Sequence, residues 1–596
     1  MSVSETLVEL FEEACRRHAE RPSLGIRVGG EFRFLTYAEV SLQVTARRAL
    51  LAELGVEAGQ RVAIIADNGQ EWAYLVYATV GRRAVFVPMY AAQSEKDWRY
   101  ILSDSQATVC FVGDQRTRQA IEAMRGELPQ LRHVISFADA LSDPEGIEAR
   151  LARLQTRTMA AETPAPDDIA GFVYTSGTTG VPKGAILTHR NIVSNAVSAA
   201  SLFPMGPTDR SLSFLPWAHA MGQTADLHAL FRLGVAIGIN GSVASLLENL
   251  QLVRPTVLIA VPRVFHRIYE NVRRQIDTKP APVRALFAAG IDASTRRARG
   301  ESLGPLRTAT LALADGLLFS KIRKRFGGSL RFAVSGSAAL SREVAEFVNA
   351  LGIDVYEGYG LTEASPIVSV NCPSARRFGT VGKPLPGVEV TIDRDIDIER
   401  GDAPSDQLVG EILVRGPNVM KGYHQAEEDT AQVLMPDGSL RTGDFGYLDQ
   451  DGYLVVTGRL KEKYKLENGK YVVPAPLEEH LKLSPLIGNC MIYGADRPYN
   501  VLLVFPEMTA VRERIGIDPW DPGARARIEG LLKEEVARFA RDFRSYERPK
   551  RLLLLEEDFT IQNGLLTPSM KIRRGAVLER YQERLRTLYN TPAAET

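Results

Sequence analysis

The chain has 596 residues, of which 45% are hydrophobic and 24% are charged, and its 72 Lys and Arg balance 72 Asp and Glu. This composition is typical of a globular protein with more than one domain. Because a net charge of zero provides no global field for nucleic acid, no nucleic-acid partner is expected. Four separated cysteines without a CxxC pair predict a reduced, cytoplasmic protein with neither a disulfide framework nor a zinc site.

The first 150 residues alternate strand patterns with helical patterns. Helices are expected at 71–80 and 98–104, between apolar strands at 61–66, 84–88 and 107–112. Strands joined by helical crossovers form a mostly parallel sheet that helices cover on both faces. The strand pattern resumes at 256–260, 330–334 and 354–357.

After residue 380 the pattern changes to short strands bounded by glycines, at 387–392, 410–415 and 452–458. Such strands predict a small antiparallel, β-barrel-like part. The predicted fold class is therefore α/β. A large N-terminal domain, residues 1–458, contains mostly parallel sheets covered by helices and the barrel-like part, and a smaller α+β domain follows at 459–596.

A segment rich in glycine and hydroxyl groups follows a strand pattern at 169–174, and it reads YTSGTTGVPKG from Tyr174 to Gly184. Glycines permit a bend that points N–H groups inward, hydroxyls add donors and one lysine adds charge, so together they can hold an anion. A Walker loop has Gly directly before its Lys, but here Pro182 stands there. The alternative is an ordinary surface loop. The predicted phosphate-binding residues are Thr175, Ser176, Gly177, Thr178, Thr179, Gly180 and Lys183.

Four further motifs follow in a fixed order. They are YGLTE at 359–363, RTGD at 441–444, GRLKE at 458–462 and LTPSMK at 566–571. Each is weak alone, but with the phosphate loop they make nearly the whole chain resemble the adenylate-forming enzymes, which include acyl-CoA synthetases, luciferases and peptide-synthetase adenylation domains. LTPSMK departs from that family's common Ser-Gly-Lys form, because Met570 precedes the lysine.

This resemblance implies that the chain uses ATP and Mg²⁺. Transfer of AMP to a carboxylate brings two anions together, so the site must neutralise the phosphates and hold the carboxylate in line. Magnesium prefers oxygen ligands, and Glu363 and Thr175 are the implied ones. Thr362 is expected to bond the α-phosphate, and Lys571 to serve the first half-reaction. Without the neighbouring motif, Glu363 would be taken for a solvated loop residue.

The resemblance also assigns the nucleoside contacts. Asp444 and Arg459 are implied to bind the ribose, and a loop of small residues to approach adenine. Lys461 matches the family's pivot, about which the smaller domain is expected to be mobile. His219 is expected to orient the carboxylate or line the acyl pocket, although a lone His is more often a packing residue. The remaining implied nucleotide contacts are Gly336, Ser337, Ala338, Glu357, Gly358 and Tyr359.

Two segments are similar to the long-chain acyl-CoA synthetases: residues 261–269 with the helical insertion that follows through Phe326, and residues 465–474. The expected function is activation of a long-chain fatty acid as acyl-AMP, followed by thioester formation with coenzyme A and release of AMP and pyrophosphate. The alternatives are loading of a carrier protein's phosphopantetheine thiol, or a binder that kept the fold without catalysis. A monomer or homodimer is expected.

The insertion at 263–325 is strongly basic, with 14 Lys and Arg against 5 Asp and Glu. Two interpretations stay open. The insertion contacts an anionic membrane at the cytoplasmic face, where fatty acids partition, or it is a set of helices with basic outer faces and apolar inner faces. Because the longest apolar runs are too short to span a bilayer, any membrane contact is expected to be peripheral.

Overall fold

The computed structural model describes residues 4–137, 146–154, 158–176, 181–242, 245–394, 409–516, 521, 523–567 and 570–590. The chain divides into two compact units. The larger comprises Met1–Thr391, Leu413–Thr442 and Leu448–Val455, and the smaller comprises Ile392–Ile412, Gly443–Tyr447 and Val456–Thr596. The predicted domain boundary at 458/459 and the mobility of the smaller domain stay predictions.

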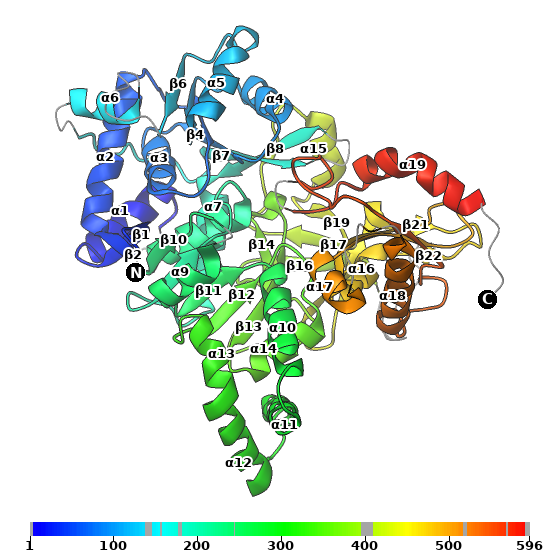
Figure 1. The fold of residues 1–596 in the computed structure, drawn as a ribbon. Coiled ribbons are helices and arrows are strands. Elements are labelled where there is room, and N and C mark those ends of the chain that lie inside the picture. The colour runs from blue at the N-terminus through cyan, green and yellow to red at the C-terminus, as the bar shows by residue number, and fades with distance from the viewer. Residues whose placement is uncertain are drawn as a thin grey trace. The chain divides into compact units, whose positions relative to one another are not determined.

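The largest sheet of the larger unit has seven strands, and it is mostly parallel (Figure 1). The parallel strands are short, almost continuously buried apolar runs, which is the pattern of a sheet covered on both faces. At one end β7 pairs antiparallel with β8, and β8 with β18. The order is β18 (Gly422–Tyr423), β8 (Pro182–Thr188), β7 (Ile169–Ser176), β4 (Val85–Met89), β3 (Arg61–Ile65), β5 (Val109–Val112) and β6 (His133–Ser136).

Helices connect these strands as the sequence predicts. The two expected helices are α3 (Gln70–Val80) and α4 (Glu95–Ser105). Capping boxes begin α1 and α2 at Thr6 and Thr36, where each hydroxyl satisfies a free backbone N–H of the first turn. The other helices of this part are α1 (Leu7–Arg17), α2 (Tyr37–Glu53), α5 (Gln115–Ala123), η1 (Arg125–Glu127), α6 (Ile147–Arg153) and α7 (His189–Ser201).

Two further sheets lie wholly in the larger unit. In the five-stranded sheet the first three strands are parallel and correspond to the predicted strands, whereas the last two pair antiparallel. The order is β11 (Val257–Ala260), β12 (Phe332–Ser335), β13 (Asp354–Gly360), β14 (Ile367–Val370) and β15 (Lys383–Pro384). The four-stranded sheet has the order β2 (Glu31–Thr36), β1 (Pro22–Val28), β10 (Ala236–Ile239) and β9 (Arg210–Ser213).

The basic insertion is helical, as predicted. Figure 1 shows α12, η4 and α13 as one continuous rod. The helices are α10 (Pro262–Asp277), α11 (Ala281–Ala298), α12 (Pro305–Ala314), the π-helix η4 (Asp315–Phe319) and α13 (Ser320–Arg325). The remaining helices of the larger unit are η2 (Gly222–His228), α8 (Ala229–Arg232), α9 (Leu246–Val253), α14 (Arg342–Ala350), η5 (Thr362–Ala364) and α15 (Glu427–Val433). None of the described helices is long and apolar enough to cross a membrane.

The glycine-bounded strands form a second four-stranded sheet, whose residues are divided between the two units. Its order is β16 (Glu389–Asp393), β17 (Gly410–Arg415), β19 (Leu440–Leu448) and β20 (Leu454–Arg459). The smaller unit is α+β, with the sheet order β23 (Ile487–Tyr493), β24 (Val501–Pro506) and β25 (Arg551–Leu554). Its other elements are η6 (Leu460–Glu462), β21 (Tyr464–Lys465), β22 (Tyr471–Val472), α16 (Pro474–Leu481), α17 (Met508–Ile515), α18 (Ala524–Phe539) and α19 (Arg574–Asn590).

An aromatic cluster lies at the centre of the larger unit. The Trp72 ring packs edge-on against Phe86 at 5.1 Å between centroids and lies 5.5 Å from Trp217. Both Trp side chains are fully buried. Trp217 belongs to the segment that carries His219, so this core supports one of the predicted site residues.

Candidate active site

The phosphate-loop segment closes the antiparallel hairpin of β7 and β8. In this ladder Thr175 lies opposite Lys183, and the Thr175 hydroxyl donates to the Lys183 carbonyl at 3.5 Å. Strand pairing therefore fixes the hydroxyl and the lysine side by side. Ser176 pairs with Pro182 through its backbone. The predicted residues Gly177, Thr178, Thr179 and Gly180 lie outside the described residues.

A carboxylate and a tyrosine lie next to this hairpin. Tyr423 in β18 pairs with Ala185 of β8, and its hydroxyl donates to Glu363 Oε1 at 2.7 Å. The backbone N–H of Met420 donates to the Glu363 carbonyl at 2.8 Å. Burial, and then the Glu363 charge, raise the pKa of the Tyr423 hydroxyl, so it stays a protonated donor. Glu363 is thus held from both its side chain and its backbone.

Lys183 has a carboxylate partner that the sequence did not indicate. Its Nζ forms an ion pair with Asp429 in the first turn of α15, and it lies 5.7 Å from the centre of the Tyr423 ring. Tyr423 and Asp429 both fall outside the motifs, so the sequence analysis did not identify them. The structure therefore gathers Lys183, Glu363, Tyr423 and Asp429 into one charged cluster.

The loop predicted to approach adenine packs against the start of η2. A Cβ on Gly336 would lie 2.8 Å from Met221 Sδ, so the end of the Met221 side chain would have to move to admit a larger residue. Ser337 adopts a left-handed φ of 69°, and its hydroxyl lies 3.1 Å from the same sulfur. Ala338 is exposed. Met221 is a contact of this loop that the sequence did not reveal.

Glu357 fastens the same loop to β13. It pairs with Ser335 in the parallel ladder, and its Oε1 accepts the Leu340 N–H at 2.8 Å. Burial raises the pKa of the Glu357 carboxyl to about 8, so the group is mainly protonated at neutral pH. Glu357 therefore contributes a neutral acid to this part of the protein.

The glycines and hydroxyls of the YGLTE segment shape a tight backbone. A Cβ on Gly360 would lie 1.9 Å from the Pro366 carbonyl oxygen, so no other residue fits without a shift of the backbone. Gly358 and Tyr359 pair with β14. Thr362 and Glu363 follow directly in η5. The segment thus brings Thr362 and Glu363 to the end of β13.

A buried hydrogen-bond network supports the segment that ends at His219. Asn68 Nδ2 donates to the Leu215 carbonyl at 2.7 Å, and Asn68 Oδ1 accepts the Trp217 N–H at 2.8 Å. Asn68 also donates to the Ser213 hydroxyl at 3.3 Å, and Ser213 donates to Asp226 Oδ2 at 2.5 Å. This clamp was not predicted, because Asn68 lies far away in the sequence.

His219 itself follows the clamped segment and is partly buried. Its Nδ1 accepts the Met221 N–H at 3.2 Å, so the imidazole lies close to the residue that contacts Gly336. The structure thus brings His219 near the adenine-side loop. Its role toward a carboxylate or an acyl chain stays a prediction.

The remaining predicted residues belong to the smaller unit. Asp444 in β19 is 2% exposed, and its Oδ1 accepts the Arg459 Nε–H at 2.8 Å. The two predicted ribose residues therefore form one pair. Lys461 lies in η6, immediately after β20. Its role as a pivot stays a prediction.

Lys571 closes a short turn in the smaller unit. The Thr567 N–H donates to the Lys571 carbonyl at 2.7 Å, and the Lys571 N–H donates to the Thr567 hydroxyl at 3.0 Å. Met570 adopts a left-handed φ of 64°, where the glycine of the family's common form would fit without strain. The turn presents Lys571 as an exposed residue.

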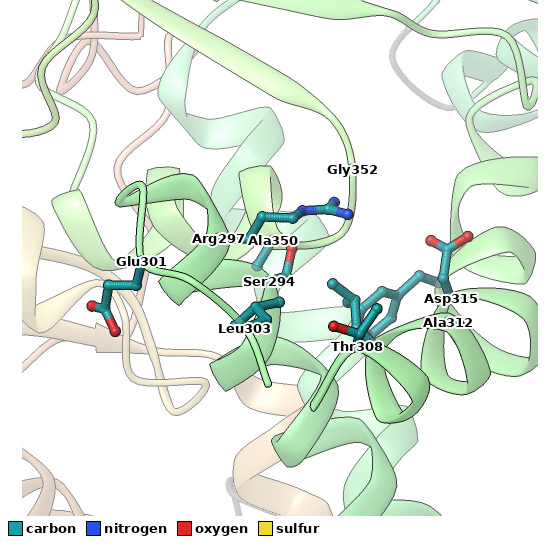
Figure 2. Close-up of a pocket in the computed structure, with 11 residues that line it drawn as sticks. Ser294, Arg297, Glu301, Leu303, Thr308, Ala312, Asp315, Ala350 and Gly352 are labelled. Carbon is teal, nitrogen blue, oxygen red and sulfur yellow. The ribbon is translucent and has the colours of Figure 1, made fainter. Parts of the chain in front are cut away.

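A cavity of about 470 Å³ lies in the insertion and is separate from the predicted site residues (Figure 2). Residues of α11, α12, η4 and the loop between α11 and α12 line it, together with Ala350 and Gly352 at the end of α14, outside the insertion. Arg297 lines it together with two carboxylates, Glu301 and Asp315, so its charges are of both signs.

Comparison with known proteins gives near-complete matches. The AMP-binding enzyme family matches residues 11–424, and the AMP-binding enzyme C-terminal domain matches residues 462–593. A long-chain-fatty-acid–CoA ligase of Mycobacterium tuberculosis is 34% identical over 591 residues, which is 94% of this chain and 93% of that relative. The peroxisomal long chain acyl-CoA synthetase 6 of Arabidopsis thaliana is 31% identical, over 98% of this chain and 86% of the relative.

Solved structures have the same fold. The adenylation domain of the carboxylate reductase from Mycobacterium chelonae has a TM-score of 0.81 at 25% identity, over 98% of this chain and 91% of that structure. The predicted fold class, with a larger unit of parallel sheets and a smaller C-terminal unit, is confirmed.

The stability of the fold should depend on the ionisation of Asp226. This side chain is fully buried, and burial raises the pKa of its carboxyl from the ordinary 3.8 to about 8. The folded state therefore keeps a proton that the unfolded chain releases. The stability that this proton provides is complete below the ordinary pKa and is lost as the pH rises through about 8.

We expect Asp226→Asn to flatten the fall of the denaturation midpoint between about pH 4 and about pH 8, the interval between the two pKa values. Urea unfolding at several pH values measures this slope. The exposed acid Glu389 provides the control, since Glu389→Gln should follow the wild type. An equal slope in Asp226→Asn and the wild type would contradict a buried, protonated Asp226.

Proposed function

Because this chain belongs to the AMP-binding enzyme family, we propose that it activates a long-chain fatty acid with ATP and transfers the acyl group to coenzyme A. First, the carboxylate attacks the α-phosphorus of ATP, the bond to the β-phosphate breaks, and acyl-AMP and pyrophosphate form. Then the CoA thiol attacks the acyl carbon, AMP leaves and the thiol proton is released. The observation that carries the proposal is the near-full-length similarity to curated long-chain-fatty-acid–CoA ligases.

The charged cluster of the larger unit is suited to the triphosphate. Lys183 supplies a cation at the base of the predicted phosphate loop, and Thr175 supplies a hydroxyl beside it. Preorganised donors of this kind stabilise charge that develops in a transition state, because they need no reorganisation during the reaction. Triphosphate binding would exchange the Asp429 partner of Lys183 for phosphate oxygens.

The residues present fit a magnesium ion that arrives with the nucleotide. Among the described residues, no group of three or more His, Cys, Asp or Glu could hold a metal ion on its own. Magnesium is commonly held by one or two carboxylates together with substrate phosphates. Glu363 and the Thr175 hydroxyl would supply the protein ligands, and the ion would neutralise phosphate charge. The Tyr423 hydroxyl would keep the Glu363 carboxylate oriented.

Loading of a carrier-protein thiol is the less supported alternative. Its chemistry shares the acyl-AMP step and differs only in the thiol that accepts the acyl group. The curated relatives are named as CoA ligases and synthetases, which favours CoA.

The direct test measures AMP release by the purified chain with acids from acetate to oleate, with and without CoA. We expect release that requires both CoA and a long acyl chain. Competition between CoA and a purified phosphopantetheinyl carrier protein separates the two acceptors. Release with the carrier protein alone would overturn the CoA assignment, and no acyl-AMP from any acid would overturn the proposal itself.

Glu363→Gln should slow acyl-AMP formation by about a hundredfold and raise the Mg²⁺ concentration required, because one anionic ligand is lost. Tyr423→Phe, which removes only the hydrogen bond to Glu363, should cost about tenfold, as supporting partners of metal ligands do. Pyrophosphate release during a Mg²⁺ titration measures both effects. Glu427→Gln, an exposed change in α15, is the control. A magnesium response of Glu363→Gln equal to that of the control would contradict the role of Glu363.

Lys571→Ala should slow the first half-reaction, acyl-AMP formation, and leave the second, thioester formation, nearly unchanged. An ammonium that bridges the α-phosphate and the attacking carboxylate acts only in the first step, so acyl-AMP formation should fall roughly a hundredfold or more. Supplied with preformed acyl-AMP and CoA, the same variant should form thioester at a near-normal rate. Lys533→Ala, an exposed lysine of α18, is the control. Unchanged rates, or equal loss of both steps, would contradict the assignment.

A further inference from the structure

The rod formed by α12, η4 and α13 exposes an unusual line of leucines. Leu306, Leu313 and Leu317 are 80%, 52% and 49% exposed. Residues seven apart share one face of an α-helix, so Leu306 and Leu313 lie on the same side of α12. Leu317 follows Leu313 after about one turn, in the wider π-helix η4, and it continues this line. Single exposed hydrophobics are normal on protein surfaces, whereas these three leucines follow one another along one rod and form an apolar strip.

The opposite side of this rod packs against the protein. Leu311, Ala314 and Phe319 are at most 7% exposed, and the Phe287 ring meets Phe319 edge-on at 5.6 Å between centroids. The rod is therefore anchored on one face, and its leucine row lies on the exposed side.

Basic side chains continue the leucine row. Lys321 and Lys324 follow Leu317 in α13, where their spacing of three residues places them on one face of that helix, and both are exposed. Arg307 is exposed beside Leu306.

The one acidic residue of the rod, Asp315, does not neutralise these basic side chains, because it is paired with Arg323. Asp315 accepts two hydrogen bonds from Arg323, at 2.6 and 3.1 Å, and this contact lowers the pKa of its carboxyl. Asp315 and Arg323 neutralise each other, so the rod keeps four basic residues without an acidic partner on the same rod, namely Arg307, Lys321, Lys324 and Arg325.

We propose that the face formed by Leu306, Leu313, Leu317, Lys321 and Lys324 docks on an anionic lipid bilayer. An apolar row flanked by cations is complementary to such a surface, since the leucines enter the boundary of the acyl chains and the lysines meet the headgroups. A lysine extends its charge to the headgroups while its stem covers apolar surface. This inference goes beyond the proposed function and does not depend on it.

The test measures co-sedimentation of the full chain with two kinds of vesicles, phosphatidylcholine alone and phosphatidylcholine mixed with phosphatidylglycerol. We expect binding to the mixed vesicles only, weakened by salt. Leu313→Glu combined with Leu317→Glu should abolish it. Lys321→Gln combined with Lys324→Gln should weaken it roughly 25-fold, since each basic residue contributes about fivefold near an anionic surface.

Two matched controls keep the test specific. Leu247→Glu alters a 56% exposed leucine of α9, and Lys533→Gln an exposed lysine of α18, so both should bind like the wild type. Unchanged thermal midpoints show that every variant is folded. Equal binding to both kinds of vesicles, no binding to either, or full binding by the leucine variant would overturn the proposal. So would a concentration-dependent dimer that the leucine variant loses, because a second copy would then cover this face.

Discussion

The antiparallel pairing of β8 with β7 on one side and β18 on the other holds the charged cluster together. The backbone ladder is sequence-independent in its geometry, yet here it sets Thr175 opposite Lys183 and Tyr423 opposite Ala185. The Tyr423 hydroxyl then donates a hydrogen bond to Glu363, which lies in η5, just after strand β13 of the five-stranded sheet. The seven-residue β8 and the two-residue β18 thus connect residues that are about 250 positions apart in the sequence, and the phosphate-binding chemistry depends on that register.

The sequence predicted the elements whose patterns are local. Buried parallel strands such as β3, β4 and β5 are short continuous apolar runs, whereas α3 is a longer apolar run and α4 buries one face only, so these elements could be recognised. The boundaries moved by one to three residues, because helix and strand ends depend on caps and neighbours. Lys183 and Glu363 were identified for a different reason: they stand in motifs of residue types that the chemistry requires.

What the sequence could not show are contacts between distant segments. Asn68 and the Leu215–Trp217 segment are about 150 positions apart, and nothing in either stretch indicates the other. Asp429 is one of three consecutive acids, and only the folded chain distinguishes it as the partner of Lys183. The protonation of Asp226 and Glu357 is likewise invisible in the sequence, since it follows from burial that the surrounding packing creates.

The ion pair between Lys183 and Asp429 gives the lysine an internal counter-ion. An unpaired lysine in a binding site gathers mobile anions from the buffer, and a nucleotide must displace them, so its affinity falls steeply as ionic strength increases. Here the anion that the nucleotide must displace is Asp429, a residue of the same chain. Its concentration near Lys183 is fixed by the fold and does not change with the buffer. The contribution of Lys183 to nucleotide affinity therefore depends less on the salt content of the surroundings than that of a solvent-facing cation would.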